Sequence, residues 1–392
     1  MVRRKQGALP LVFALGACQP APAAAPAAAS EPSAPSATRA SAARELGEHA
    51  PPAAPLRPAE PEPSIRAPAA RFLKGETHVH TSGSFDGHTP PVDALRFYAE
   101  RGYDFVALTD HNRVTIASPP EGLLFVPGVE YTQNSTDCAP RPSPGYRCLF
   151  HTTGMFVDPA RDRTGGGLIR LPFQRGRRAA YEQQIRAARA LDGIVALNHP
   201  QFHFAADARL IKALAVEADV TLVGFFNAAL TAQHPGGRAE AEGRGEALWD
   251  QVLSDGVLVY ALATDDAHHF ADAEERRRRG KFAYVGDRGW IMVRAEKTLP
   301  AIRAALLAGE FYASTGVSLA TLERSRERFS LTTLGERSAR TRFVGKGGRT
   351  LATSEGPSAT YVPRGDEGYV RAVVEAADGT KAWTQPVMLK AR

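Results

Sequence analysis

Seven short apolar runs recur between residues 71 and 268 of this 392-residue chain, and segments with helical spacing follow several of them. In chain order the runs are RFLKGETHVH, YDFVALTDH, LLFVPGVEYT, CLFHTTGMFV, GIVALNHP, VTLVGFFNA and GVLVYALATDDAH. Strands that alternate with helices favour parallel β–α units. The pattern therefore predicts an α/β fold, specifically a distorted TIM-like (β/α)7 barrel, with an open doubly wound sheet as the alternative.

The helical segments and the C-terminal part complete this prediction. PPVDALRFYAERG, AAYEQQIRAARALDG, ARLIKALAVEA and AEGRGEALWDQVLSDG carry helical spacing and often end at glycine. After residue 317 the pattern changes to short strands with turn signals, such as the Asp378-Gly379 pair. We expect a barrel over residues 71–317 and a small β-sandwich-like domain over residues 318–392. The second contains no histidine, so the chemistry should lie in the first.

The N-terminal 70 residues have the composition of an export signal and a tether. VRRKQ precedes the apolar ALPLVFALGA, which is too short to span a bilayer as a mature helix. LGAC resembles the lipobox of a bacterial lipoprotein, which implies cleavage of residues 1–17 and acylation of Cys18; an ordinary secretory signal is the alternative. Residues 18–70 are rich in Ala, Pro and Ser and should form a disordered tether. We thus expect an exported, membrane-anchored protein of the periplasm or outer membrane.

The net charge argues against a nucleic-acid partner, and the cysteine content bears on disulfide formation. The formal charge of +6 falls once Arg3, Arg4 and Lys5 leave with the signal, to 45 basic against 42 acidic residues. That balance is too mild to indicate a nucleic-acid binder. Cys138 and Cys148 lie ten residues apart, and an oxidising compartment favours a disulfide between them over two free thiols.

Polar residues of metal-binding type follow the apolar runs. THVH ends the first, LTDH the second, GVE the third, NHP the fifth and DDAH the seventh. In a parallel barrel these strand ends meet at one face. His78 and His80 are two residues apart on a strand and so point to the same side, and Asp266 and His268 repeat that spacing. Neutral imidazoles with carboxylates suit zinc, manganese or iron.

Five motifs taken together resemble a known superfamily. THVHTSGSFDG, ALTDHN, PGVEYT, NHP and TDDAH, in this order, are similar to those of the PHP (polymerase and histidinol phosphatase) superfamily of metal-dependent phosphoesterases. RGWIMVRA, GEFYASTG and the ending AWTQPVML are closer to its CehA/McbA-like metallohydrolase branch. The resemblance runs from about Lys74 to the C-terminus and implies a distorted (β/α)7 barrel that holds two or three divalent metal ions.

The resemblance also implies which residues hold each ion. A first metal would be held by His78, His80, Glu130 and Asp266, a second by Asp86, His111 and His268 with Glu130 bridging, and a third position by His151 and His199. His151 lies nearer the start of the fourth run than its end, unlike the other candidates. His88 belongs to the same segment as Asp86, but the motif does not require it, and we interpret it as a loop residue.

Two further residues are candidates for a catalytic role. Asp110 precedes His111 and either orients an imidazole or caps the turn after its strand. Arg113 either meets a substrate anion or is a solvated loop residue. The basic runs ARDRTGGGLIRLPFQRGRR and EERRRRGK follow the fourth and seventh strands and favour a small, anionic substrate.

Three functions fit these observations. The first is a metal-dependent phosphoesterase in which two ions activate a water and clamp an in-line displacement at phosphorus. The second keeps the same metal site but cleaves a carbamate, ester or amide. The third is a non-catalytic surface lipoprotein whose β-rich tail binds glycan or protein. The sequence contains neither a G-x-S-x-G elbow nor the Lys-Ser/Thr of a phosphate loop, so a serine hydrolase and a P-loop enzyme are not expected.

Overall fold

The computed structural model describes residues 71–142, 147–202, 205–233, 237–335 and 339–389. The predicted signal (1–17), Cys18 and the predicted tether (18–70) lie outside these residues, as do His203 and His234. All described residues belong to the unit Ser64–Arg392. Among them, no helix is both long enough and apolar enough to serve as a membrane span.

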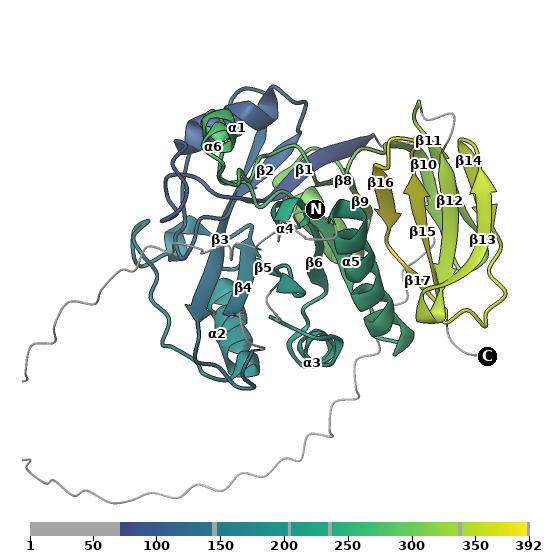
Figure 1. Cartoon of the computed structure of the whole chain (residues 1–392), viewed down its shortest axis with the longest axis horizontal. Helices are drawn as coiled ribbons and strands as arrows, with labels where there is room; N and C mark the ends of the chain where they lie inside the picture. Colours follow the sequence, from purple (N-terminus) through teal and green to yellow (C-terminus); the bar gives the residue numbers. More distant parts are fainter. Residues whose placement is uncertain (1–70, 143–146, 203–204, 234–236, 336–338, 390–392) are drawn as a thin grey trace, which may run out of the picture. The chain divides into compact units, whose positions relative to one another are not determined.

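Each of the seven apolar runs forms a strand, which confirms a mixed α/β fold (Figure 1). The strands are β1 (Phe72–Val79), β2 (Phe105–Leu108), β3 (Leu124–Ser135), β4 (Cys148–Met155), β5 (Ile194–Leu197), β6 (Leu222–Asn227) and β7 (Tyr260–Thr264). The four predicted helical segments give α1 (Pro91–Ala99), α2 (Arg177–Ala190), α3 (Ala208–Ala218) and α5 (Gly237–Ser254). The short α4 (Ala228–Gln233), α6 (Ala273–Arg278) and α7 (Leu299–Ala308) were not predicted.

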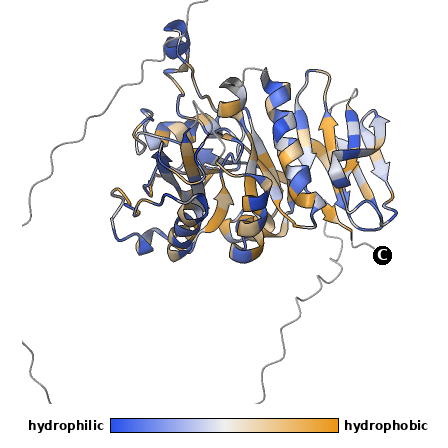
Figure 2. Cartoon of the chain, turned by 60° about the horizontal axis from the view of Figure 1, so that its bottom comes forward, coloured by the Kyte–Doolittle hydropathy of each residue, from blue (hydrophilic) through white to orange (hydrophobic). Residues whose placement is uncertain are grey.

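Helix ends follow from local chemistry. Asp207 caps the start of α3 by accepting a hydrogen bond from the Leu210 amide, and Thr298 does the same for α7 through Ala301. Helix α7 ends at Gly309, whose φ of 70° suits a residue without a side chain. Figure 2 shows hydrophobic strands in the middle of the fold, while strands of the C-terminal part mix hydrophobic and hydrophilic residues.

Strands β1 to β7 lie side by side in chain order, but one of them has the opposite direction. Neighbours are parallel except at β4, which is antiparallel to both β3 and β5. The expectation of an all-parallel arrangement was therefore wrong at this strand. The physical reason is that the described residues between β3 and β4 form no crossover helix, and strands joined without a crossover are antiparallel. A disulfide between Cys138 and Cys148 links this connection to the start of β4.

The predicted closed barrel is not found in the described residues. Strands β1 and β7 meet only at an isolated bridge between Val79 and Ala267, where the His80 amide donates to the Ala267 carbonyl at 2.9 Å. The first half of β1 instead pairs with the antiparallel strand β8 (Trp290–Arg294). Because β8 occupies that edge of β1, the sheet continues outward rather than closing on β7.

The sheet extends from β8 into the C-terminal part, across the boundary expected at residue 317 (Figure 1). The added strands, in sheet order, are β9 (Phe311–Ser314), β16 (Lys381–Thr384), β15 (Tyr369–Glu375), β12 (Arg340–Gly345) and β13 (Arg349–Glu355), and β17 (Val387–Met388) pairs with β15. A second sheet consists of β10 (Leu319–Arg324), β11 (Phe329–Thr333) and β14 (Ser358–Tyr361). The two sheets share a hydrophobic core that includes Leu331, Phe343 and Val374.

Buried ion pairs fix the C-terminal sheet to helix α5. The fully buried guanidinium of Arg371 on β15 donates to both carboxylate oxygens of Asp250, each at 2.7 Å, and to Glu246 at 3.3 Å. Trp383 on β16 donates its indole N–H to Glu246 at 3.0 Å and stacks on Phe226 at a ring-centroid distance of 3.9 Å. These contacts make the C-terminal strands part of the wall behind α5 and β6.

A glutamine side chain replaces a missing strand neighbour of β7. The Ala261 amide donates to Gln385 Oε1 at 2.9 Å, and Gln385 Nε2 donates to the Ala261 carbonyl at 2.9 Å. Both backbone groups of Ala261 are thereby satisfied away from water, as buried polar groups require. The C-terminal segment thus completes the edge of the strand that precedes Asp266.

We predict that Arg371→Met lowers the free energy of unfolding by about 3–5 kcal/mol, because it leaves buried carboxylates without their guanidinium partner. Urea unfolding measures the change. Arg340→Met removes an arginine from the exposed pair with Glu355 and should cost less than about 0.5 kcal/mol. Equal unfolding midpoints for the two variants would contradict a role for Arg371 in fixing the C-terminal sheet.

Candidate metal centre

The fold brings all nine predicted metal ligands to one place. Ligand atoms of seven of them form three overlapping groups, in each of which the atoms lie within 4.8 Å of one another. The groups are His78, His80 and Glu130; His80, His111 and His268; and Glu130, His151 and His199. Asp266 and Asp86 adjoin these groups through the contacts given below.

The strand directions explain why these residues meet. His111, His199 and Asp266 follow the C-terminal ends of the parallel strands β2, β5 and β7. His151 lies near the start of β4 and opposite Thr132 of β3. Because β4 is antiparallel, its start lies at the same rim as the ends of its neighbours, which accounts for the unusual place of His151 in its strand.

The carboxylate of Glu130 lies at the middle of the cluster. Its Oε1 lies 3.2 Å from His78 Nε2, 3.2 Å from His151 Nδ1 and 3.6 Å from His199 Nε2. Its Oε2 lies 2.7 Å from His111 Nδ1 and 3.6 Å from His80 Nε2. Asn198, which precedes His199, also donates to Oε1 at 2.6 Å. One buried carboxylate is therefore shared by five imidazoles.

Two further carboxylates flank Glu130 on different sides. Asp266 Oδ1 lies 3.1 Å from His80 Nε2 and 3.5 Å from His78 Nε2, and Asp266 Oδ2 accepts from Asn227 at 3.0 Å. Asp86, which is partly exposed, has its Oδ2 3.5 Å from His111 Nε2 and 3.5 Å from His268 Nε2. The first group is thus enclosed, whereas the second opens toward solvent through Asp86.

Hydrogen bonds on the outer ring nitrogens fix three imidazole tautomers. His80 Nδ1 contacts Ser84 Oγ at 2.9 Å, His268 Nδ1 contacts the Asp266 carbonyl at 2.9 Å, and His151 Nε2 contacts Asn134 Oδ1 at 2.7 Å. A carbonyl oxygen can only accept, so these rings carry a proton on the outer nitrogen at His268 and His151. The opposite nitrogen then directs a lone pair into the cluster, as a metal ligand requires.

Ser84 connects several of these groups. Its hydroxyl donates to Asp110 Oδ1 at 2.8 Å and accepts from the His111 amide at 3.0 Å, in addition to its contact with His80. A hydroxyl has one proton to donate, and here it goes to the carboxylate. His80 Nδ1 is therefore the donor toward Ser84, which leaves His80 Nε2 as an acceptor facing Glu130 and Asp266.

The electrostatics favour a bound cation. Burial alone would raise the pKa of Glu130, but the charges of His151, His78 and His111 hold that pKa well below its usual range. Burial together with His268 and His111 lowers the pKa of His80 to about 3. Although burial opposes it, the charge of Glu130 raises the pKa of His111 to about 10. At neutral pH the cluster thus contains the ionised carboxylate of Glu130, a neutral His80 and a protonated His111, whose proton a bound cation would displace.

Three of the seven non-glycine residues with positive φ in the described part of the chain lie at the same place. Asn112, His199 and Asp266 have φ values of 50°, 26° and 51°, in the left-handed region that non-glycine residues rarely adopt. Such conformations persist only where the surroundings enforce them, and they cluster at functional sites. Here each lies beside or within the candidate ligand set.

The residues present fit divalent metal ions. His151 Nδ1, which lies 3.2 Å from Glu130 Oε1, is a buried nitrogen without a hydrogen-bond partner among the described residues. His78 Nε2 and His80 Nε2 lie 3.1 Å apart, and both face carboxylate oxygens. Lone pairs that converge without enough protons between them are stabilised by a cation, and imidazole with carboxylate suits zinc, manganese or iron.

The two predicted catalytic residues have structural contacts. Asp110 accepts hydrogen bonds from the Thr81 amide and hydroxyl at 2.6 Å each and from Thr115 at 2.5 Å, besides Ser84. It therefore holds the loop after β1 and reaches an imidazole only through Ser84. Arg113 donates to the Gly166 carbonyl at 2.7 Å and lines a cavity of about 430 Å³, and its buried Nε has no hydrogen-bond partner in the part of the chain that the structure describes.

The ion pairs of the two basic runs lie at the protein surface, away from the metal cluster. Five of their arginines make ion pairs with acidic side chains close by. These are Arg161, Arg175, Arg178, Arg277 and Arg279. The expectation of an anionic substrate therefore rests on Arg113 more than on these runs.

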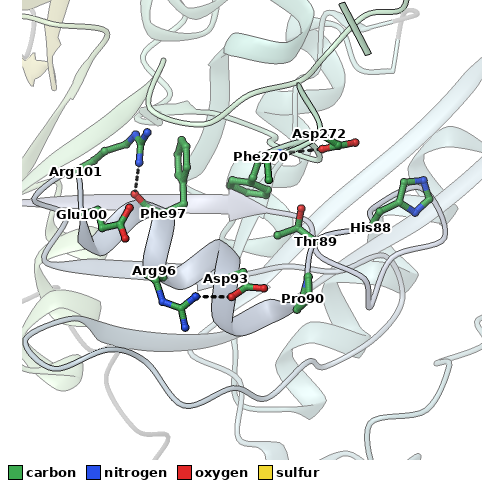
Figure 3. Close-up of a pocket in the computed structure, with 11 residues that line it drawn as sticks. His88, Thr89, Pro90, Asp93, Arg96, Phe97, Glu100, Arg101, Phe270 and Asp272 are labelled. Atoms are coloured by element: carbon green, nitrogen blue, oxygen red, sulfur yellow. Dashed lines mark hydrogen bonds and ion pairs between the residues drawn. The ribbon is translucent and has the colours of Figure 1, made fainter. Parts of the chain in front are cut away.

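A separate cavity of about 520 Å³ is lined by His88–Pro90, by residues of α1 and by Phe270–Asp272 (Figure 3). His88 is exposed and lines it, together with the aromatic side chains of Phe97 and Phe270. Its lining residues among the described part of the chain include none of the nine candidate ligands. His88 thus lies outside the cluster, next to the rim.

Sequence reasoning missed the polar side chains that orient the ligands. These are Ser84, Thr132, Asn134, Asn198 and Asn227. Thr132 and Asn134 follow Glu130 by two and four residues on β3, so strand periodicity places them on its face. Asn227 is the last residue of β6, and candidate ligands lie at the ends of other strands in the same way. Those two patterns could have identified three of the five.

Comparison with known proteins adds little. The chain matches no protein-family model and no curated protein. One similar solved structure is a crystal structure, from Bacteroides vulgatus ATCC 8482, of a two-domain protein containing a predicted PHP-like metal-dependent phosphoesterase. It is 17% identical, the match covers 84% of this chain and 100% of that chain, and the TM-score is 0.43. A likeness at this level says nothing about function. The case for a metal centre therefore rests on the side chains of the cluster.

We predict that Ser84→Ala weakens zinc binding about 10- to 100-fold, because His80 loses the contact that fixes its tautomer. Competition with a chromophoric chelator measures the affinity. Ser82→Ala is the matched control, since Ser82 is an exposed serine of the same loop and should bind zinc as the wild type does. Equal affinities for both variants would show that Ser84 does not orient a ligand.

Proposed function

We propose that this protein is a metal-dependent hydrolase, and that it acts on phosphoesters. The observation that supports the proposal is the convergence of six imidazoles and three carboxylates, arranged in overlapping groups around Glu130. A chain that only binds partners gains nothing from burying such a set, because unpaired buried charge is costly.

The side chains of the cluster divide into sets that would each hold one ion. His78, His80 and Asp266 would hold a first ion, Asp86, His111 and His268 a second, and His151 with His199 a third, with Glu130 between them. Divalent ions of this kind activate a water molecule near neutral pH and stabilise charge on the substrate. Ser84 and Asn134 keep the histidine lone pairs turned inward, and Asn198 and Asn227 hold the carboxylates in place.

Arg113 supports a phosphoester over a neutral ester. Its position two residues after His111 and its buried Nε, which has no hydrogen-bond partner among the described residues, leave a donor for an anionic oxygen. The cavity that Arg113 lines is also lined by Ser82 and Gly83, from the loop between His80 and Asp86, although none of the nine candidate ligands lines it. A carbamate, ester or amide hydrolase and a non-catalytic surface protein are the other outcomes of the test below.

We further propose that the protein is exported and anchored through a lipid on Cys18. The support is the basic and apolar N-terminal sequence that ends in LGAC, and the disulfide between Cys138 and Cys148, which suits an oxidising compartment. The anchor would leave the hydrolase at a membrane surface with access to small solutes.

We predict hydrolysis of p-nitrophenyl phosphate or bis-p-nitrophenyl phosphate with added manganese or zinc, and loss of both activity and bound metal in His80→Ala. The matched control is His88→Ala, because His88 is an exposed histidine of the same loop outside the cluster. Steady-state rates and metal analysis of the same preparations provide the readout.

Each other outcome points to a different function. Turnover of p-nitrophenyl acetate without either phosphoester would favour the ester or carbamate hydrolase. Less than one equivalent of metal per chain, with no turnover of any substrate, would favour the non-catalytic protein. Full activity in His80→Ala would contradict the proposed ligand set.

A further inference from the structure

Phe85 is an exposed aromatic residue in contact with a candidate ligand. Its side chain is 71% exposed, although it lies between Ser84 and Asp86 in the loop after β1. Its ring stacks on the imidazole of His111 with a centroid distance of 4.7 Å and an interplanar angle of 14°. One face of the phenyl ring therefore covers the imidazole, and the high exposure leaves the other accessible from solvent.

The loop fixes the position of this ring from both sides. On one side, the buried hydroxyl of Ser84 is hydrogen bonded to Asp110 and to the His111 amide. On the other, Asp86 faces His111 and His268, and a Cβ on Gly87 would lie 2.1 Å from the Thr81 carbonyl oxygen. Only glycine permits this close approach, so the chain cannot swing freely about Phe85.

Aromatic rings also flank two other imidazoles of the cluster. Phe202 contacts His199 edge to face at 5.6 Å, and Tyr284 contacts His268 in the same way at 5.6 Å. Phe85 differs because its ring lies nearly parallel to the imidazole. A planar group of a bound substrate could stack on its free face while the reacting atom lies beside Asp86 and His111.

We propose that Phe85 is a specificity-determining residue that stacks on a planar, unsaturated group of the substrate. The substrate would then be a phosphoester of an aromatic or similarly flat alcohol. This inference rests on the proposed hydrolase function and extends it to a substrate class. Stacking of a ring on an aromatic side chain corresponds to about 5- to 150-fold in affinity.

Equilibrium binding tests the proposal without turnover. Calorimetry on the metal-loaded protein gives the Kd of phenylphosphonate and of methylphosphonate. We expect the wild type to bind phenylphosphonate about tenfold more tightly, Phe85→Trp to keep that preference, and Phe85→Leu to reduce it to less than about twofold. The Kd of methylphosphonate and the metal content should stay within twofold in all variants.

A control and the contrary outcomes separate the two proposals. Phe173→Leu replaces another exposed phenylalanine, and it should retain the wild-type preference. An unchanged preference in Phe85→Leu, or equal loss of both phosphonates, would show that Phe85 only shields His111 or supports the loop. Wild type that binds both phosphonates equally would overturn the stacking role and leave the phosphoesterase intact. Wild type that binds neither would overturn both.

Discussion

The buried carboxylate of Glu130 is the group on which the site depends. Its charge lies in the protein interior, where an unpaired carboxylate is costly, and its neighbours are His78, His80, His111, His151 and His199. Those imidazoles come from four strands or strand ends, so their geometry relies on the correct pairing of the whole sheet. The direction of β4 matters most, because only an antiparallel strand brings its early residue His151 to this rim.

The C-terminal strands support the site from a distance. Gln385 occupies the edge of β7 at Ala261, and β7 leads directly to Asp266. Arg371 and Trp383 bind the carboxylates of helix α5, which packs beside β6. The β-rich part is therefore not a loosely attached addition. It provides hydrogen bonds at the edge of β7, a strand that meets β1 only at one isolated bridge among the described residues.

Much of the candidate site could be predicted from the sequence because strand ends and strand periodicity are local properties. His78 and His80 share a face through their spacing, and a polar residue after an apolar run identifies Asp266. The direction of β4 was not predicted, since the segment between β3 and β4 (residues 136–147) is long enough for either a hairpin or a parallel crossover. The roles of Ser84 and Asn198 were also hidden, because serine and asparagine are common in loops and strands without any function. The closed barrel failed because β8 takes the free edge of β1, and no local pattern predicts which distant strand pairs there.

Anomalous diffraction from crystals grown with manganese or zinc is the most direct test of the metal centre. We predict at least two anomalous peaks per chain. One should lie about 2.0–2.3 Å from ligand atoms of Glu130 and of His78 or His80, and another between Asp86, His111 and His268. A map with no peak among these residues, or with peaks only at surface carboxylates, would contradict the assignment of this cluster as a metal site.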